Sequence, residues 1–480
     1  MADNFPGTRF NASWNEKSLT VVSHSLFSAW MLAFIFKGQI LLSLADVYRI
    51  DSTQLIYSGF IAIFTGLLLS GFVIKSKKAA KRLFLSSYLI FIAISAIFFF
   101  PPSRFWLLGI LLGSFLAGAC VASWGIYLKS STPRRERIKT VADMLILSNI
   151  LMIPLNVIAI HLSPHLGLGI SMLMLCVAFI LALKLPEDLN DDFPTLSKVN
   201  KSPESIAKLL VFLCLFIIVV TITSGLMYEV VNPAFIHLEQ ITSWYWATPY
   251  IIALIIMRSL SLKINRVNVL FIALAMIGLG FIAFIILDRG IVSYFVINTL
   301  ILMALGVFDL FWWSILADTL DLHQNPTKIL GVGMSANILG IFVGGLIGSA
   351  ITQADTQSFS SSLVALAAVC VALALLPPLN NYLSSYLQDQ FFLSDFSKLP
   401  PPEQVSRIER TANFGNLSDR ELQVTSLLLQ GKTYSTIANE LFISQNTVKY
   451  YVKNIYTKFN IRSRAELFNL VLKNGNNKTG

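Results

Sequence analysis

The sequence predicts an all-α protein: a polytopic membrane helical bundle of two six-helix halves, followed by a small cytoplasmic domain of four helices. Three observations lead to this fold class. Only 13% of the 480 residues are charged and 55% are apolar, whereas a soluble globular chain carries about 25% charged residues. The apolar residues gather in windows of about 20 residues, which is long enough to cross a bilayer as a helix. After residue 416 the charge density returns to that of a soluble domain.

We expect twelve membrane spans, six in each half. They lie at residues 21–44, 51–74, 83–100, 105–128, 141–161, 166–185, 207–228, 240–258, 267–287, 291–316, 329–352 and 358–376. The first half therefore covers 21–185 and the second 207–376, with a polar segment at 1–20 and a polar loop at 186–206. We expect no cleavable signal peptide, because the first apolar run follows a polar segment and is long enough to span.

Basic residues gather on one side of the predicted membrane domain. The opposite side holds only Arg49, Arg104 and Arg289, while the connections on the side of the N-terminus hold Lys75, Lys77, Lys78, Lys81, Arg82, Lys129, Arg134, Arg135, Arg137, Lys139, Lys184, Lys198, Lys201, Lys208, Arg258, Lys263, Arg266 and Lys328. Lysine and arginine accumulate in cytoplasmic loops. We therefore expect a multi-pass protein of the cell membrane, in contact with its lipid. Its N-terminus and, because the number of spans is even, its C-terminal domain are expected in the cytoplasm.

The two halves repeat each other at a shift of 188 residues. The shift places span 83–100 on 271–288 and brings Gly118 onto Gly306 and Trp124 onto Trp312. Six spans, a polar loop and six more spans resemble the major facilitator superfamily of transporters, whose halves are such repeats. The resemblance is architectural and covers about residues 20 to 380.

Residues 377–416 are expected to link the two domains. The segment from Leu379 to Phe396 has the pattern of an amphipathic helix along the membrane surface. The prolines at 400–402 favour an extended linker up to about Asn416, since consecutive prolines favour polyproline geometry.

The C-terminal domain at 417–473, with a short tail at 474–480, has the pattern of four helices. Ser418 and Glu421 predict a capping box for the first helix, which should end before Gly431. A short second helix covers 434–441, and the last covers 464–472. Three apolar side chains of the last helix are expected at a contact between two copies: Leu467, Leu470 and Val471.

The third helix should begin after Ser444, a second N-cap, and run to about Phe459. Its apolar stripe consists of Val448, Val452, Ile455 and Phe459, spaced four, three and four. This spacing leaves Lys449, Tyr450 and Lys453 on the outer face.

Residues 417–467 read LSDRELQVTSLLLQGKTYSTIANELFISQNTVKYYVKNIYTKFNIRSRAEL. They resemble the LuxR-type helix-turn-helix domain, whose pattern runs LSxRE, a helix, G, IAxxL, S, TVK, and finally K followed by RxRAEL. The resemblance covers the whole domain, and one departure is Tyr451, where the family commonly has His. It implies base contacts from Lys449, Tyr450 and Lys453, and phosphate contacts or capping from Thr433, Ser444, Asn446 and Thr447. The alternative is a solvated helix face for the lysines and a covering role for Tyr450.

Charged residues inside spans are costly and suggest function, and Lys37 and Asp309 lie in the first and tenth spans. The first, fourth, seventh and tenth spans line the central cavity of a transporter-like fold. We therefore predict a small-molecule pocket that includes Lys37, Trp124, Tyr127, Tyr228, Glu229, Asn298, Asp309, Trp312 and Trp313. The alternative is that the aromatic rings mark the membrane interface and that Lys37 pairs structurally with an acid.

The superfamily's loop motif GxxxD(R/K)xGR(R/K) is altered here to GFVIKSKKAAKR, with Lys75 at the acid position, which argues against proton-coupled transport. No enzyme motif, cofactor fingerprint or metal-ligand cluster occurs in the sequence, so we expect neither catalysis nor a cofactor.

The sequence predicts a membrane-bound one-component regulator that senses an unknown small molecule and binds double-stranded promoter DNA as a homodimer, with RNA polymerase as a further candidate partner. One alternative is a transporter that doubles as a receptor. Another is a membrane tether for the DNA-binding domain, with no ligand.

Overall fold

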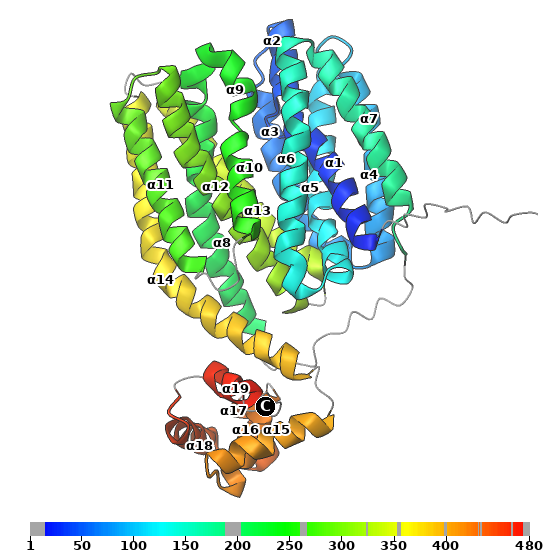
Figure 1. The fold of residues 1–480 in the computed structure, drawn as a ribbon. Helices are drawn as coiled ribbons and strands as arrows, with labels where there is room; N and C mark the ends of the chain where they lie inside the picture. The colour runs from blue at the N-terminus through cyan, green and yellow to red at the C-terminus, as the bar shows by residue number, and fades with distance from the viewer. Residues whose placement is uncertain are drawn as a thin grey trace, which may run out of the picture. The chain divides into compact units, whose positions relative to one another are not determined.

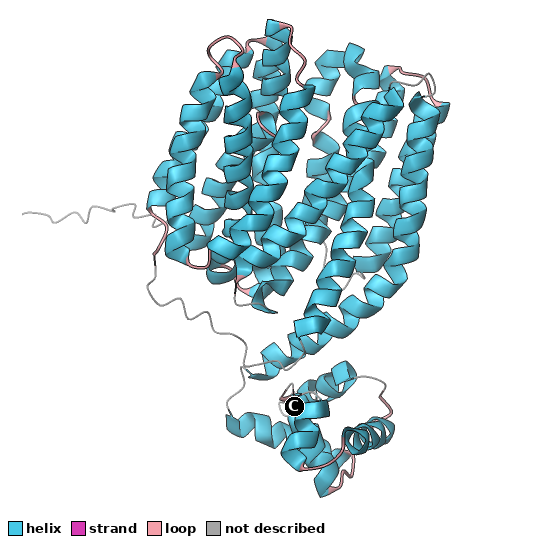
Figure 2. Cartoon of the chain, turned by 180° about the vertical axis from the view of Figure 1, so that it is seen from behind, coloured by secondary structure: helices cyan, strands magenta, loops and turns pink. Residues whose placement is uncertain are grey.

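The computed structural model describes residues 15–187, 203–259, 266–322, 325–352, 357–397, 401–430, 432, 434–461 and 464–473. All regular elements in these ranges are helices (Figure 2), as the sequence predicts. The chain divides into two compact units, one holding most of the membrane helices and the other holding the C-terminal domain.

The first half of the membrane domain consists of the helices α1 to α7 (Figure 1). They are α1 Glu16–Ala33, α2 Gln39–Tyr48, α3 Thr53–Val73, α4 Lys77–Ile97, α5 Arg104–Ser131, α6 Arg137–His161 and α7 Pro164–Leu183, with the 3-10 turn η1 Arg134–Glu136 before α6.

The second half begins with α8 Pro203–Leu226, which continues into the π-helix η2 Met227–Val231 and the 3-10 helix η3 Pro233–Leu238. It continues with α9 Glu239–Tyr245, α10 Thr248–Ser259, α11 Arg266–Ile286, α12 Ile291–Thr319, η4 Leu320–Leu322, α13 Pro326–Thr352 and α14 Gln357–Ser397.

Within the described residues, ten helices are long and apolar enough to cross a membrane. Two of the twelve expected spans, 21–44 and 240–258, are instead each divided into two shorter helices, α1 with α2 and α9 with α10. Gly38 lies at the first break, where an added Cβ would stand 2.0 Å from the backbone carbon of Ala33. Lys37 beside it has φ 51°, in the left-handed region that ends a helix. The chain therefore cannot continue as one helix through this point.

The repeat predicted at 188 residues is present in the helix boundaries. The shift carries α5 onto 292–319, against the observed Ile291–Thr319 of α12, and α4 onto 265–285, against the observed Arg266–Ile286 of α11. Gly118 and Gly306 occupy equivalent close crossings: an added Cβ would lie 2.3 Å from the Ile63 carbonyl oxygen and 2.9 Å from the Tyr250 carbonyl oxygen, respectively. Glycine is needed at both crossings because the two helix backbones touch.

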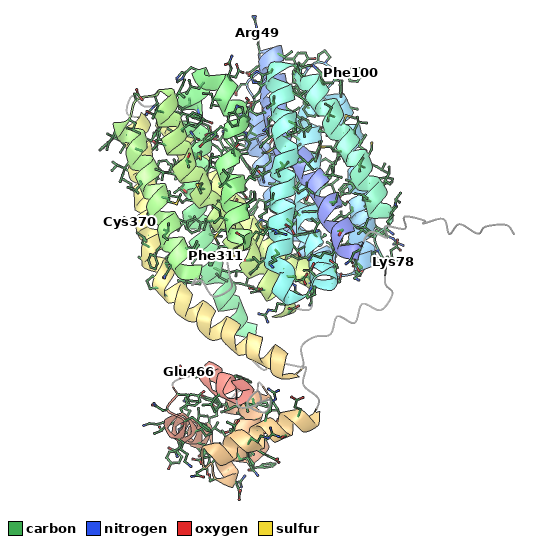
Figure 3. The ribbon with its side chains drawn as sticks, in the orientation of Figure 1. Arg49, Lys78, Phe100, Phe311, Cys370 and Glu466 are labelled. Carbon is green, nitrogen blue, oxygen red and sulfur yellow. The ribbon has the colours of Figure 1, made fainter. Side chains whose placement is uncertain are left out.

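The halves meet where α3 and α5 pack on α13 and where α6 packs on α10 and α12. Large apolar side chains remain exposed on the outside of the bundle, among them Val73, Leu173 and Val292 at 74%, 65% and 76%. Such a surface suits lipid and not water. In Figure 3, Lys78 lies at one end of the bundle and Arg49 at the opposite end, as the predicted alternation of sides requires.

The connection between the domains differs from the expected extended linker. The segment from Leu379 to Phe396 forms the C-terminal part of α14, and residues Pro401–Phe414 form a further helix, α15. Pro401 and Pro402 stand in the first turn of α15, where a missing N–H costs nothing. Ile408 on this helix is 7% exposed and belongs to the core of the C-terminal domain, so burial favours a helix here.

The remaining helices are α16 Asp419–Leu429, α17 Tyr434–Leu441, α18 Gln445–Lys458 and α19 Arg464–Lys473. Leu467 and Val471 of α19 are fully buried in the core of their own domain, and Leu470 packs against it. The expected contact between copies is therefore wrong for Leu467 and Val471, which the core of their own domain buries. Their apolar spacing serves the fold, because α19 packs on α15 and completes the core of the domain.

Candidate DNA-binding surface and membrane-domain cavity

Glu421 fixes the start of the C-terminal domain. Its carboxylate accepts hydrogen bonds from the Ser418 backbone N–H at 2.8 Å and the Ser418 hydroxyl at 3.1 Å, while Ser418 Oγ accepts from the Glu421 N–H. This is the predicted capping box. Lys458 Nζ, from the end of α18, lies 2.6 Å from the same carboxylate. One acidic side chain therefore caps α16 and ties α18 to it.

The turn between α17 and α18 is built from a short, strained segment. Phe442 has φ 56° and is 94% exposed. Ser444 follows as the N-cap of α18, and its hydroxyl accepts the Thr447 N–H at 3.1 Å. Ile437 of α17 and Val448 of α18 are fully buried on the inner side. The two helices thus form a helix-turn-helix with α18 as its second helix.

The outer face of α18 carries Lys449, Tyr450 and Lys453, all exposed, and Tyr450 is 61% exposed. The helix contains three lysines and no acidic residue. Lys449 and Lys453 also line a shallow hollow of about 510 Å³ between α17 and α18, with Tyr434 at its other side. Asn446 at the first turn is exposed and Thr447 is half-buried, whereas Thr433 lies outside the described residues.

The membrane domain encloses a cavity of about 170 Å³. Its lining comes from both halves: residues of α1, α3, α5 and α6 on one side, and of α8, α10, α12 and α13 on the other. Asp309 of α12 is the only acidic residue in this lining, which contains neither lysine nor arginine among the described residues. Tyr250 donates a hydrogen bond to the Asp309 carboxylate at 2.9 Å.

Three polar atoms of the lining have no hydrogen-bond partner in the described part of the chain: the side-chain oxygen of Asn337, the indole nitrogen of Trp246 and Nδ1 of His24. Asn337 is 6% exposed. A buried polar atom without a partner is costly, and a ligand with polar atoms of its own would supply the missing hydrogen bonds.

Lys37 forms an ion pair with Glu229, with 2.5 Å between Nζ and Oε1, and donates to the Tyr228 carbonyl oxygen at 3.2 Å. The pair joins the break after α1 to the π-helix η2 and thus links the two halves. Neither side chain lines the cavity. The structural alternative considered for Lys37, pairing with an acid, is therefore present here.

The other predicted pocket residues separate into two groups. Tyr228, Asp309 and Trp313 line the cavity. Trp124 instead stacks on His24, with ring centroids 4.8 Å apart. Lys37, Tyr127, Glu229, Asn298 and Trp312 also stay outside the lining.

Helix packing explains three of these exclusions. Tyr127 donates to the Lys77 carbonyl oxygen at 3.3 Å, and Asn298 donates to the Tyr294 carbonyl oxygen at 3.1 Å within its own helix. Trp312 is completely buried.

The profile of the family described as bacterial regulatory proteins, luxR family (GerE), matches residues 415–471. Spore germination protein GerE of Bacillus subtilis is 39% identical over 59 residues, which are 12% of this chain and 80% of that protein. The C-terminal domain belongs to the LuxR family.

Two longer relatives are matched over part of their length. A putative HTH-type transcriptional regulator of Aeromonas salmonicida is 52% identical over 56 residues, which are 12% of this chain and 29% of that protein. Response regulator UvrY of Escherichia coli is 28% identical over 92 residues, and the match spans 19% of this chain and 42% of UvrY. The chain therefore matches less than half the length of these two relatives.

The membrane domain has the major facilitator fold. The human organic anion transporter MFSD10 superposes with a TM-score of 0.56 at 14% identity, covering 75% of this chain and 99% of that one. The transporter FucP in its outward conformation superposes with a TM-score of 0.50 at 12% identity, covering 75% and 98%. The likeness concerns the fold. The chain thus joins a LuxR-type regulator domain to a membrane domain whose fold is shared with transporters.

Several residues that line the membrane-domain cavity were not predicted from the sequence. They are His24, Ser28, Ser148, Asn149, Ser224, Trp246, Tyr250 and Asn337. The polar residues among them lie in α1, α6, α8 and α13, so a search for amides and hydroxyls in every apolar span would have found most of them. No group of three or more His, Cys, Asp or Glu suited to a metal occurs among the described residues.

Proposed function

We propose that this protein is a membrane-anchored one-component transcription regulator, in which a small molecule binds the cavity of the transporter fold and the LuxR-type domain binds promoter DNA. The observation that carries the proposal is the combination in one chain of an exposed, acid-free face on α18 with a cavity that both membrane halves enclose. A separate phosphorylation domain is not needed for this arrangement.

At the DNA, Lys449, Tyr450 and Lys453 are the proposed base contacts, because the second helix of a helix-turn-helix enters the major groove with its N-terminal half. Ser444, Asn446, Thr447 and Thr433 are proposed to contact phosphates or to cap the helix, since unpaired N–H groups at a helix start favour anions. Specific sites are normally bound by paired domains, so we propose a homodimer on DNA, and RNA polymerase as a further partner.

The side of the membrane follows from charge. Lys17 pairs with Glu136 at 2.7 Å, so α1 begins at the end of the bundle where the basic connection before α6 lies. Lysine and arginine gather on the cytoplasmic side. We propose that both ends of the chain are cytoplasmic, which gives the LuxR-type domain access to DNA, and that lipid covers the apolar outer surface.

The second candidate function is a transporter that also acts as a receptor. It is favoured by the polar lining of the cavity and by the fold it shares with the organic anion transporter MFSD10 and with FucP. Uptake into proteoliposomes distinguishes the two: a receptor binds its ligand without accumulating it inside.

The test of DNA binding uses the full chain in cells. Genome-wide mapping of its DNA sites should give discrete promoter peaks for the wild type. The peaks should disappear in the double variant Lys449→Ala and Lys453→Ala. Arg410→Ala is the matched control, because Arg410 is an exposed basic residue of α15, outside the helix-turn-helix. Identical peaks from the double variant and the wild type would overturn the proposal.

A further inference from the structure

The lining of the cavity in the membrane domain has one charged side chain, Asp309, and no described side chain of opposite charge pairs with it. Asp309 has no ion pair with any described lysine, arginine or histidine. Its carboxylate accepts a hydrogen bond from the Tyr250 hydroxyl at 2.9 Å and interacts with the side-chain amide of Asn337. A carboxylate inside a membrane protein normally pairs with a cation or lines a functional site. The cavity itself supplies no lysine or arginine, so a cation has to come from the guest.

Hydrogen-bonding capacity near Asp309 points to a guest with several donors. The side-chain oxygen of Asn337 lines the same cavity, is buried, and accepts no hydrogen bond. An ionised carboxylate accepts and does not donate. Two acceptors in one small cavity match the three N–H donors of a primary ammonium group, whereas a quaternary ammonium or a carboxylate offers none.

The rest of the cavity suits a short apolar body. Trp246, Trp313 and Tyr228 present aromatic rings to it, and ring faces attract cations within about 6 Å. Its 170 Å³ corresponds to the space of roughly six waters and is smaller than the ~300–1,000 Å³ of pockets for drug-sized ligands. The guest is therefore small.

We propose that this cavity binds a small primary amine in its protonated form, with the ammonium group between Asp309 and Asn337 and the apolar body against Trp246 and Trp313. The inference rests on the proposed sensing function and specifies the chemical class of ligand. A primary amine satisfies the lone carboxylate, the unpaired amide oxygen and the aromatic wall at once.

Direct binding to the purified full chain in lipid nanodiscs tests the inference. The probes are butylamine, phenethylamine and tryptamine, followed by three analogues of phenethylamine: phenethyl alcohol, 3-phenylpropanoate and trimethyl(phenethyl)ammonium. At least one amine should bind the wild type. It should bind more tightly than its alcohol, carboxylate and quaternary analogues, and this comparison requires no variant.

Asp309→Asn keeps the side-chain volume and removes the charge. It should weaken amine binding at least tenfold, because the ammonium group loses its ionised hydrogen-bond acceptor. Asp46→Asn is the control, since Asp46 is exposed and should leave binding unchanged. The carboxylate or the alcohol binding as tightly as the amine, an unchanged dissociation constant in Asp309→Asn, or no binding by any amine at millimolar concentration would each overturn the inference.

The readout separates this inference from the proposed function. Amine binding that depends on Asp309 supports the ligand class even when promoter output does not respond, because that second result counts against sensing alone. A promoter that responds to an anion and not to any amine overturns the ligand class and supports sensing.

Discussion

Replacing Glu421 separates the two roles of its carboxylate in the LuxR-type domain. Glutamine keeps an oxygen that can accept from the Ser418 N–H, because a capping box functions with either residue, but it removes the charge that faces Lys458. Alanine removes both. Comparing Glu421→Gln with Glu421→Ala therefore measures the ion pair and the cap in turn.

The magnitude follows from burial. The Glu421 side chain is 6% exposed and that of Lys458 is 37% exposed, with 2.6 Å between the charged atoms. An exposed ion pair contributes about 0.2–1 kcal/mol and a hydrogen bond to a charged group about 1.5–3 kcal/mol. Because Glu421 is buried and Lys458 is partly exposed to solvent, we expect Glu421→Gln to lower the free energy of unfolding by about 1–2 kcal/mol. Glu421→Ala adds the lost cap, about 1 kcal/mol more.

The assay is thermal and urea unfolding of the fragment 401–480, which includes α15. A domain of this size loses about 4–8 °C in Tm per kcal/mol, so Glu421→Gln should melt roughly 5–15 °C lower. Burial raises the pKa of the Glu421 carboxyl, but the hydrogen bonds from Lys458 and Ser418 outweigh it and hold the pKa below its usual range. The stabilisation is therefore full above the unfolded value of about 4.3 and is lost as the pH falls through the folded value.

Glu440→Gln is the matched control, since Glu440 pairs with Lys432 at 2.5 Å while both side chains are partly exposed, at 38% and 29%. It should cost about 0.5 kcal/mol or less. The reasoning is refuted if Glu421→Gln costs no more than this control at neutral pH. It is also refuted if the difference between wild type and Glu421→Gln grows, and does not shrink, as the pH falls below about 4.

Three further predictions concern DNA and the membrane domain. Lys449→Ala should weaken operator binding by about 1–3 kcal/mol and lower the slope of log K against log salt by about one. Fluorescence anisotropy measures both quantities, and the control Arg410→Ala should change neither. Equal binding by Lys449→Ala and wild type would contradict this prediction. Footprints at concentrations where the promoter responds should cover two half-sites about one helical turn apart, and protection of one half-site would count against a dimer. Lys37→Met and Glu229→Gln should each leave one charge unpaired inside the bundle and lower the amount of protein in the membrane, and the double variant should restore that amount. Immunoblots of membranes measure the abundance. Normal abundance of both single variants would show that the ion pair does not stabilise the protein.

The face of α18 could be predicted from the sequence because it depends on local spacing. Val448, Val452 and Ile455 recur on one side of a helix that a serine caps, so the exposure of Lys449 and Lys453 follows without knowledge of the rest of the fold. The capping box at Ser418 is equally local. Both features are present in the structure with their expected hydrogen bonds and burial.

The membrane cavity could be predicted only in part, because a membrane helix is apolar on all sides and its periodicity does not show which face turns inward. Asp309 is conspicuous in any apolar span, and it does line the cavity. Trp124 is equally conspicuous but packs on His24, and Asn337 contributes through a crossing of helices from different parts of the chain. Charge in an apolar span therefore identified one cavity residue, whereas tertiary packing determines which aromatic side chains line the cavity.

The prolines at 401 and 402 show a second limit. Local preference favours extended backbone after consecutive prolines, but burial of Ile408 with the core of the LuxR-type domain favours a helix. The sequence contains both the prolines that favour extended backbone and the apolar residue that favours a helix. Which preference prevails depends on the packing of α15 with α16 and α19.

The ion pairs between the two membrane halves also bear on how fast a ligand enters and leaves the cavity. Lys37–Glu229 joins them where α1 breaks, and Arg137–Asp321 joins them at the start of α6, with 2.8 Å between the charged atoms and 4% exposure for the arginine side chain. A ligand that reaches the cavity by separation of the halves has to open one of these bridges, and a charge that stays buried after it loses its partner costs about 3–5 kcal/mol. If that cost appears in the opening barrier, entry and exit slow by about a hundredfold or more. We therefore expect a sluggish receptor, whose output continues after the stimulus is withdrawn and averages over brief fluctuations in its surroundings.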